Sequence, residues 1–311
     1  MLLIQYTLVF ATVLALVALA GMFSERSGVI NLGLEGTMVM GALGGALMMH
    51  YLPVNTNGFV VVFVSILGSL VFGLIYSMLL SVASVTFKAD QTITGTAMNI
   101  MAPALATVIV KAITLKETGK ASPKLDYIQF HNYFVFKIGK MEFNYFFILM
   151  IILVIIAWIL LYKTKFGMRL MSCGENPQAA DSVGINVTKY RYTGVAISGL
   201  LGGLGGFAFI NSANSSWPFD SGVAGFGFLA LAVMIFGQWK PIFICLGALL
   251  FGFFRTFGIV YTSYSWIEKL SINPIFYQML PYIVCLIVLM FTSKKSRAPK
   301  AEGIPYNKSS R

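Results

Sequence analysis

Residues 144–163 read NYFFILMIILVIIAWILLYK and carry no charged side chain before the final lysine. A helix needs about 20 mostly apolar residues to cross the hydrocarbon core of a bilayer, and this stretch has that length. An apolar surface of this size is not stable in water. The stretch therefore predicts a membrane-spanning helix. The rest of the chain is then expected to fold in a lipid bilayer.

The whole chain has the same character. Hydrophobic residues make up 58% of its 311 residues and charged residues 11%, with a mean hydropathy of +0.81, whereas soluble domains carry about 25% charged residues. The net charge is +11, but the basic residues lie between apolar runs and near the end of the chain. That placement is typical of orientation in a membrane, and no basic face with interleaved aromatics predicts nucleic acid binding.

Eight other apolar stretches resemble 144–163, so we predict an all-α polytopic membrane protein with about nine transmembrane helices. Residues 28–50 and 92–112 contain polar side chains, which leaves each of them open to a broken or re-entrant path. The nine predicted spans are 4–22, 28–50, 58–86, 92–112, 144–163, 191–212, 222–238, 241–261 and 274–292.

The distribution of lysine and arginine predicts the orientation. With the loop 163–191 and the tail 293–311 inside, the inner segments hold twice as many basic residues as the outer ones. Because the inner side of a membrane protein is the basic side, we expect the N-terminus outside and the C-terminus inside. The predicted organisation is a transmembrane domain, 1–292, with an outer loop 113–143, followed by a basic inner tail, 293–311, that we expect to be disordered.

The outer loop contains an aromatic and β-branched segment, 133–143, around Gly139. This pattern predicts a short hairpin with its turn at that glycine. Two interpretations stay open: a docking platform for an external partner, or a lid on the helix ends.

Small residues recur every four positions along three of the predicted spans. Such spacing forms one helix face and lets backbones approach closely. A weak similarity between 27–29 and 221–223, both Ser-Gly-Val, favours an inverted repeat. The small residues are Gly33, Thr37, Gly41 and Gly45; Ser65, Ser69, Gly73, Ser77 and Ser81; and the pairs Gly199/Gly203 and Gly202/Gly206.

The inner loop encodes a short helix with both ends defined. Asn176 suits the N-cap, Pro177 the first helical position and Gly184 the residue after the end, which predicts a helix over 177–183. A helix this short is marginal in water, and its side chains are too small and polar to anchor it on a bilayer. We therefore expect it to contact a protein partner at the inner face.

The same loop carries the most specific resemblance. The segments KFGMRL at 165–170 and GENPQAADSVGINV at 174–187 resemble the coupling region of ABC-importer permeases for branched-chain amino acids, simple sugars and nucleosides. The segment ERSGVINLGLEG at 25–36 resembles the N-terminal signature of that family, in the form typical of its nucleoside branch. Two later segments, GFGFLALAVMIFG at 225–237 and QMLPY at 278–282, extend the resemblance over nearly the whole chain.

The resemblance implies a multi-pass permease of the bacterial plasma membrane with no cofactor of its own. Its implied partners are a second permease, homologous or identical, a cytoplasmic ATPase that hydrolyses ATP, and an external substrate-binding lipoprotein. Nucleosides are the expected substrate, with sugars and branched-chain amino acids as alternatives. The expected ATPase-coupling residues are Gly174, Glu175, Asn176, Pro177, Ala180 and Asp181, and Ala180→Trp is expected to block docking.

Polar residues inside the spans are candidates for the substrate pathway. Ionisable groups at membrane depth are costly, so Glu35 and Arg255 are expected either to line a pathway or to form a pair that joins two helices. Uncharged groups suit a hydroxyl-rich neutral substrate, although helix–helix hydrogen bonds explain them equally well. The candidate pathway residues are Asn31, Glu35, Gln91, Thr94 and Asn99.

The sequence contains no pattern for catalysis in this chain. Its two histidines are far apart, and neither a catalytic triad order, a phosphate-binding loop motif nor a metal-ligand spacing is present. We therefore expect a transporter rather than an enzyme. An ion-coupled secondary transporter is the alternative from another class, although no carboxylate cluster provides a coupling-ion site.

Overall fold

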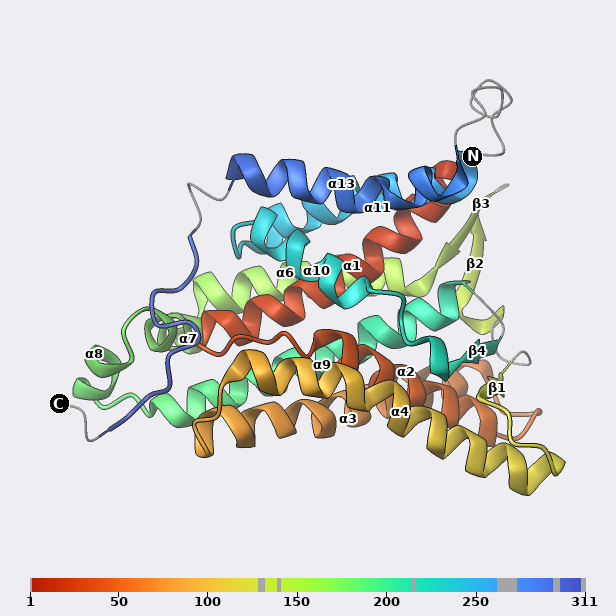
Figure 1. Ribbon diagram of the computed structural model, residues 1–311, viewed down its shortest axis with the longest axis horizontal. Coiled ribbons are helices and arrows are strands. Elements are labelled where there is room, and N and C mark those ends of the chain that lie inside the picture. The colour runs from red at the N-terminus through yellow and green to blue at the C-terminus, as the bar shows by residue number, and fades with distance from the viewer. Residues whose placement is uncertain are drawn as a thin grey trace.

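The computed structural model describes residues 2–127, 132–138, 141–213, 216–261, 273–292 and 297–308. Its helices run along the long axis of the molecule (Figure 1). Six helices among these residues are long and apolar enough to cross a membrane: Leu3–Arg26, Gly58–Thr86, Gln91–Thr118, Tyr145–Lys163, Val187–Asn211 and Pro241–Val260. A mostly helical membrane protein is confirmed, whereas the predicted count of nine spans and the predicted orientation are not.

Two of the predicted spans are shorter as helices than as apolar stretches. The helix predicted over 28–50 begins only at Leu34, because the preceding residues are not helical. The helix predicted over 222–238 is the 11-residue segment Phe226–Phe236. Hydropathy averages over a window and does not detect the unwound backbone within it, which explains both differences.

The helices of the described chain are α1 (Leu2–Arg26), α2 (Leu34–Tyr51), α3 (Gly58–Ser81), α4 (Gln91–Thr118), α6 (Tyr145–Lys163), α7 (Lys165–Glu175), α8 (Pro177–Ser182), α9 (Val187–Ala213), α10 (Phe226–Phe236), α11 (Pro241–Val260) and α13 (Pro274–Thr292). A π-helical turn, Val82–Thr86, extends α3, and short 3-10 turns lie at Asn132–Phe134 and Phe219–Ser221. The strands are β1 (Lys124–Asp126), β2 (Val135–Ile138), β3 (Met141–Asn144) and β4 (Ser216–Pro218).

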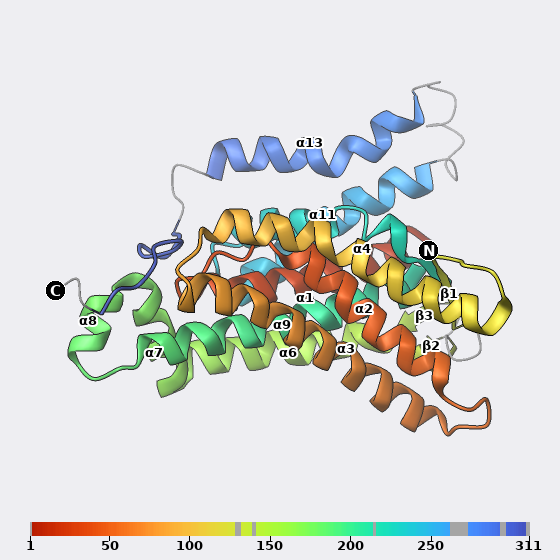
Figure 2. The ribbon, with the colours of Figure 1, turned by 60° about the horizontal axis from the view of Figure 1, so that its bottom comes forward.

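The centre of the bundle is formed by α1 and α9. Most of each helix is buried within the protein, whereas about a quarter of the apolar stretch of α3, α4 and α6 is buried and each of these helices keeps an exposed apolar face. Figure 2 shows α3 and α13 on opposite sides of this centre. In a membrane protein such exposed apolar faces contact lipid, so the burial pattern separates the inner helices from those at the lipid boundary.

The small-residue faces make the close backbone contacts that the sequence predicts, and the fold places α2 and α3 against α9. A Cβ added at Gly41 would lie 2.1 Å from Cα of Gly203, and one added at Gly73 would lie 2.4 Å from the carbonyl oxygen of Gly199. One at Gly206 would lie 1.9 Å from the carbonyl oxygen of Met38. No side chain fits at these distances, because the three backbones are in direct contact.

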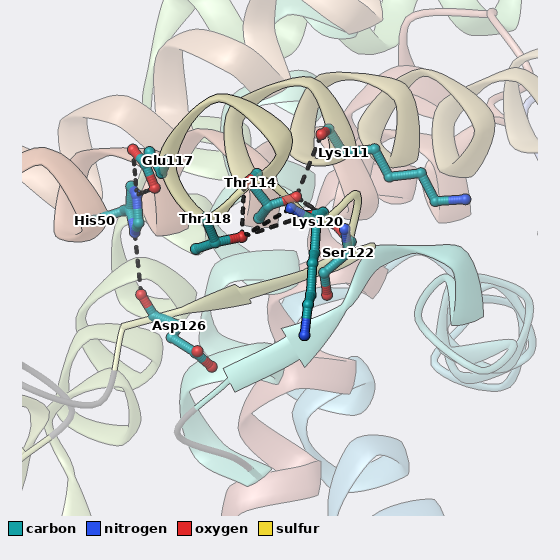
Figure 3. Close-up of polar contacts among 8 residues, drawn as sticks. All are labelled: His50, Lys111, Thr114, Glu117, Thr118, Lys120, Ser122 and Asp126. Carbon is teal, nitrogen blue, oxygen red and sulfur yellow. Dashed lines mark hydrogen bonds and ion pairs between the residues drawn. The ribbon is translucent and has the colours of Figure 1, made fainter.

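One end of the bundle is covered by two small antiparallel sheets, β1–β4 and β2–β3. The second sheet is the predicted hairpin, with Phe136 opposite Phe143; its turn at Gly139 lies outside the described residues. His50, at the end of α2, joins α4 and β1: its Nε2 lies 3.0 Å from the carboxylate of Glu117, and its Nδ1 lies 3.2 Å from the carbonyl oxygen of Asp126 (Figure 3).

The opposite end holds α7, α8 and the described part of the tail (Figure 1). We expected the tail to be disordered, but residues 297–308 are held against the bundle. The N–H of Ala301 donates to the carbonyl of Gly174 at 2.8 Å, and the buried guanidinium of Arg191 donates to the carbonyl of Ile304 at 2.8 Å. A buried guanidinium needs acceptors, and the tail supplies one of them.

Candidate functional site

The helix α8 forms as its sequence predicts. The side-chain oxygen of Asn176 accepts a hydrogen bond from the N–H of Ala179 at 3.0 Å, and Pro177 occupies the first turn. Gly184 adopts a left-handed φ of +81° just beyond the helix. The helix ends at Ser182, one residue earlier than predicted.

The packing of α8 changes the roles expected of two coupling residues. Ala180 is 3% exposed and packs against Cys173 and Val187, so it faces the protein and not a partner. Gly174 is also buried, and an added Cβ there would lie 2.4 Å from the carbonyl oxygen of Arg26. Gly174 and Ala180 therefore position the loop, and Ala180→Trp would displace α8 itself.

The exposed surface of α8 is formed by a different set of residues. Gln178, Ala179 and Ser182 are exposed, and Val183 is 73% exposed at the end of the helix. Of the other expected coupling residues, Glu175 and Asn176 are exposed, while Pro177 and Asp181 are half-buried. We define the α8 face as Gln178, Ala179, Ser182 and Val183. A lone valine at the end of a polar helix was the signal in the sequence that could have identified it.

A second candidate site lies where α2 and α10 begin. The carboxylate of Glu35, in the first turn of α2, accepts hydrogen bonds from the N–H groups of Gly225 at 2.8 Å and Gly227 at 2.6 Å. These N–H groups belong to the start of α10, where a helix has unpaired donors and a partial positive charge. Glu35 therefore caps the neighbouring helix, and we call this contact the α2–α10 junction.

The helices α2 and α10 run from this junction toward opposite ends of the molecule (Figure 1). The α2 helix ends near His50, beside the sheets. The α10 helix ends next to Trp239, whose carbonyl accepts a hydrogen bond from Arg26 at the α7 end. Two helices of 18 and 11 residues that meet by their N-termini inside a bundle resemble the broken segments that provide backbone donors for a solute in transporters.

Gln91 and Asn99 hold the non-helical segment that precedes α2. The side-chain oxygen of Gln91 accepts from the N–H of Ile30 at 2.7 Å. The amide of Asn99 accepts from the N–H of Gly36 at 2.8 Å and donates to the carbonyl of Leu32 at 2.7 Å. These bonds replace those lost where the helix is unwound, which matches the interpretation of these side chains as links between segments.

Asn31 and Thr94 also make local contacts. The side chain of Asn31 is fully buried and donates to Oγ of Ser198 at 2.9 Å. Thr94 is half-buried and donates to the carbonyl of Asp90 in its own helix at 2.7 Å. Of the five predicted pathway residues, Glu35 contacts the start of α10 and Asn99 contacts the start of α2 beside it.

Arg255 approaches the same junction from α11. Its guanidinium lies 5.4 Å from the ring centroid of Phe226, the first residue of α10. Among the described residues no ion pair joins Arg255 to Glu35. The two ionisable groups therefore contact different groups at the α10 start. Arg255 lies over an aromatic face and Glu35 accepts from backbone donors, so they do not form the helix-joining pair that the sequence left open.

Comparison with known proteins gives a consistent result. The family model for the permease component of the branched-chain amino acid transport system matches residues 3–289. The chain is 38% identical to the Nucleoside ABC transporter permease protein NupC of Lactococcus lactis over 97% of this chain and 95% of that protein. It is 38% identical to the Guanosine ABC transporter permease protein NupQ of Bacillus subtilis over 98% and 96%.

A more distant relative carries a different substrate in its name. The Putative glucose ABC transporter permease protein of Haloferax volcanii is 31% identical over 80% of this chain and 74% of that protein. No solved structure matches the chain at a significant level.

Proposed function

The chain belongs to the family of branched-chain amino acid transport system permease components, and from that premise we propose that it moves nucleosides through the membrane for an ABC importer. The chain is an ABC-transporter permease, a multi-pass protein of the bacterial plasma membrane. The observation that carries the substrate is the 38% identity, over nearly the full length, to two permeases named for nucleosides and guanosine.

The polar groups of the α2–α10 junction support the proposal that the transported solute is polar. Its carboxylate and backbone N–H groups lie within a bundle of otherwise apolar helices, and isolated polar groups at membrane depth are typical of a transport site. Nucleosides are uncharged and rich in hydroxyls, so backbone donors and acceptors recognise them without a counter-ion. In this proposal Glu35 orders the junction and the neighbouring unwound backbone contacts the solute.

The proposed partners follow from the same premise. An ATPase binds the α8 face, a second permease, identical or homologous, completes the pathway, and an external lipoprotein delivers the nucleoside. The observation that supports the ATPase contact is the seating of α8 between α7 and α9: Ala180 packs on residues of both helices. A displacement of α8 is therefore transmitted to the spans through α9 and through α7, which continues from α6.

The transport test compares solutes in cells that express the complete importer. We expect uptake of radiolabelled guanosine that excess uridine or adenosine reduces and that excess ribose, glucose or leucine does not. An ATPase subunit with an inactivated nucleotide site should abolish uptake. Competition by leucine or by a sugar alone would move the assignment to those branches of the family, and uptake that follows an ion gradient without ATP would favour the secondary transporter.

The proposed orientation predicts a labelling pattern. Lys120→Cys, at the sheet end, should react with a membrane-impermeant maleimide added outside, whereas Val183→Cys and Ala298→Cys should react only after the membrane is opened. All three positions are exposed. Reaction of Cys173 should be slow, because burial raises the pKa of its thiol to about 11 and leaves little thiolate at neutral pH. Labelling of Ala298→Cys from outside would reverse the orientation.

A further inference from the structure

A cavity of about 330 Å³ opens between the end of α6 and the start of α11. It lies apart from both the α8 face and the α2–α10 junction. Its lining combines cations with aromatic and aliphatic side chains: Trp158, Tyr162, Lys163, Lys240, Pro241, Ile242 and Phe243. We call it the α6–α11 cavity.

Two lysines give this cavity a positive charge, and its lining contains no acidic residue to neutralise them. Lys163 Nζ lies 5.5 Å from the ring centroid of Trp158, and Lys240 Nζ lies 5.5 Å from that of Phe243. None of the lining residues is acidic, and neither ammonium forms an ion pair within the described chain. Two ammonium groups that line one cavity attract an anion, and the nearby rings hold their apolar stems.

The walls next to the cavity are apolar and face outward. Ile156 and Ile159 on α6 are 48% and 44% exposed, and Leu246 and Phe243 on α11 are 56% and 53% exposed. Both helices meet the length and hydropathy of a membrane span. The lysines lie at the helix ends that adjoin α7 and residues 237–240, where the chain leaves the apolar region, so the cavity is at the depth of lipid head groups.

We propose that the α6–α11 cavity binds the phosphate of an anionic phospholipid, with Lys163 and Lys240 on the phosphate and the acyl chains along the exposed faces of α6 and α11. The choice of a lipid over free phosphate rests on the apolar walls, which a soluble anion would leave unused. Basic pockets between membrane helices on the inner side are suited to anionic head groups. A zwitterionic lipid also has a phosphate, but it brings its own cation next to the two lysines.

The cavity lies at the joint between α6 and α7, so a lipid bound there would affect the helix that leads to α8. Lys163 is the last residue of α6, and α7 begins at Lys165. Added bulk at Gly167 in α7 would lie 2.2 Å from the carbonyl oxygen of Leu160, so the two helices are in close contact at this joint. A bound phospholipid would steady the end of α6, against which α7 packs and from which α7 leads to α8.

The test uses the assembled importer and native mass spectrometry with added phosphatidylglycerol or phosphatidylcholine. Each lysine near an anionic surface contributes about 1 kcal/mol, so Lys163→Gln with Lys240→Gln should weaken phosphatidylglycerol binding by about 30-fold. Replacing both lysines by arginine should preserve binding. The matched control, Lys116→Gln with Lys120→Gln, removes two exposed lysines from the opposite end and should leave binding unchanged.

Several outcomes would overturn the proposal. Binding of phosphatidylglycerol by the glutamine pair at the strength of the unmodified importer would exclude the two lysines as the site, and equal loss in the control pair would indicate general surface charge. If the unmodified importer retained phosphatidylcholine as strongly as phosphatidylglycerol, the site would not require an anionic lipid. Displacement of the bound phosphatidylglycerol by millimolar inorganic phosphate would indicate that the cavity binds a soluble anion. Loss of ATPase binding with lipid binding unchanged would assign the cavity to the ATPase.

Discussion

Val183→Asp is expected to lower solute-stimulated ATP hydrolysis by the assembled importer by about tenfold or more. Val183 is 73% exposed at the end of α8, and its apolar side chain is the one on the α8 face best suited to a partner pocket. An aspartate there would bury an unpaired charge at the interface, and losing an interface hot spot costs about 2 kcal/mol or more. The measurements are co-purification of the ATPase with the permease and its rate of hydrolysis.

The control for this prediction is Val54→Asp, the same substitution at a 62% exposed position on the opposite end of the molecule, which should leave hydrolysis unchanged. Ala180→Trp serves a different purpose. Because Ala180 is 3% exposed, the indole would force α8 from its seat and should reduce the stability of the loop together with docking. If Val183→Asp binds the ATPase with full yield and hydrolysis remains stimulated, the ATPase contact is not on the α8 face.

Glu35→Ala is expected to reduce nucleoside uptake by about a hundredfold. The substitution removes an acceptor that two N–H groups at the start of α10 share, at 2.8 Å and 2.6 Å. Hydrogen bonds to charged groups contribute about 1.5–3 kcal/mol each, so the junction loses at least about 3 kcal/mol. Within the bundle no water replaces the carboxylate easily, and the start of α10 should shift.

The graded variant Glu35→Gln keeps one oxygen acceptor and places an amide donor against the other N–H, so its uptake should fall by about tenfold. Asn31→Ala is the comparison within the unwound segment before α2, since it removes a buried hydrogen bond to Ser198 and none to the start of α10; it should lower thermal stability and should reduce uptake less than Glu35→Ala does. Uptake is measured in cells and assembly by co-purification. Normal uptake by Glu35→Ala, with a reduced melting temperature alone, would make Glu35 a structural link and not part of the transport site.

Features set by short stretches of sequence were predictable. The apolar content of 144–163 predicts α6, and Asn176, Pro177 and Gly184 define α8, because a helix cap depends on residues within four positions of each other. The aromatic and β-branched residues around Gly139 predict the β2–β3 pair for the same reason. The small residues of 33–45, 65–81 and 199–206 also predicted close backbone contacts, since each face is a property of one helix.

Contacts between distant segments were decided by the tertiary structure alone. The sequence places Glu35 in an apolar stretch, but only the fold brings it to Gly225 and Gly227, 190 and 192 residues away. Likewise, Ala180 points inward because α7 and α9 pack on that side of α8, and residues 297–308 lie against the bundle because the backbone of Ala301 meets Gly174. The local sequence determines whether a side chain is stabilised by apolar surroundings or by a hydrogen bond. Which residue becomes its partner depends on which surfaces the packed helices bring together.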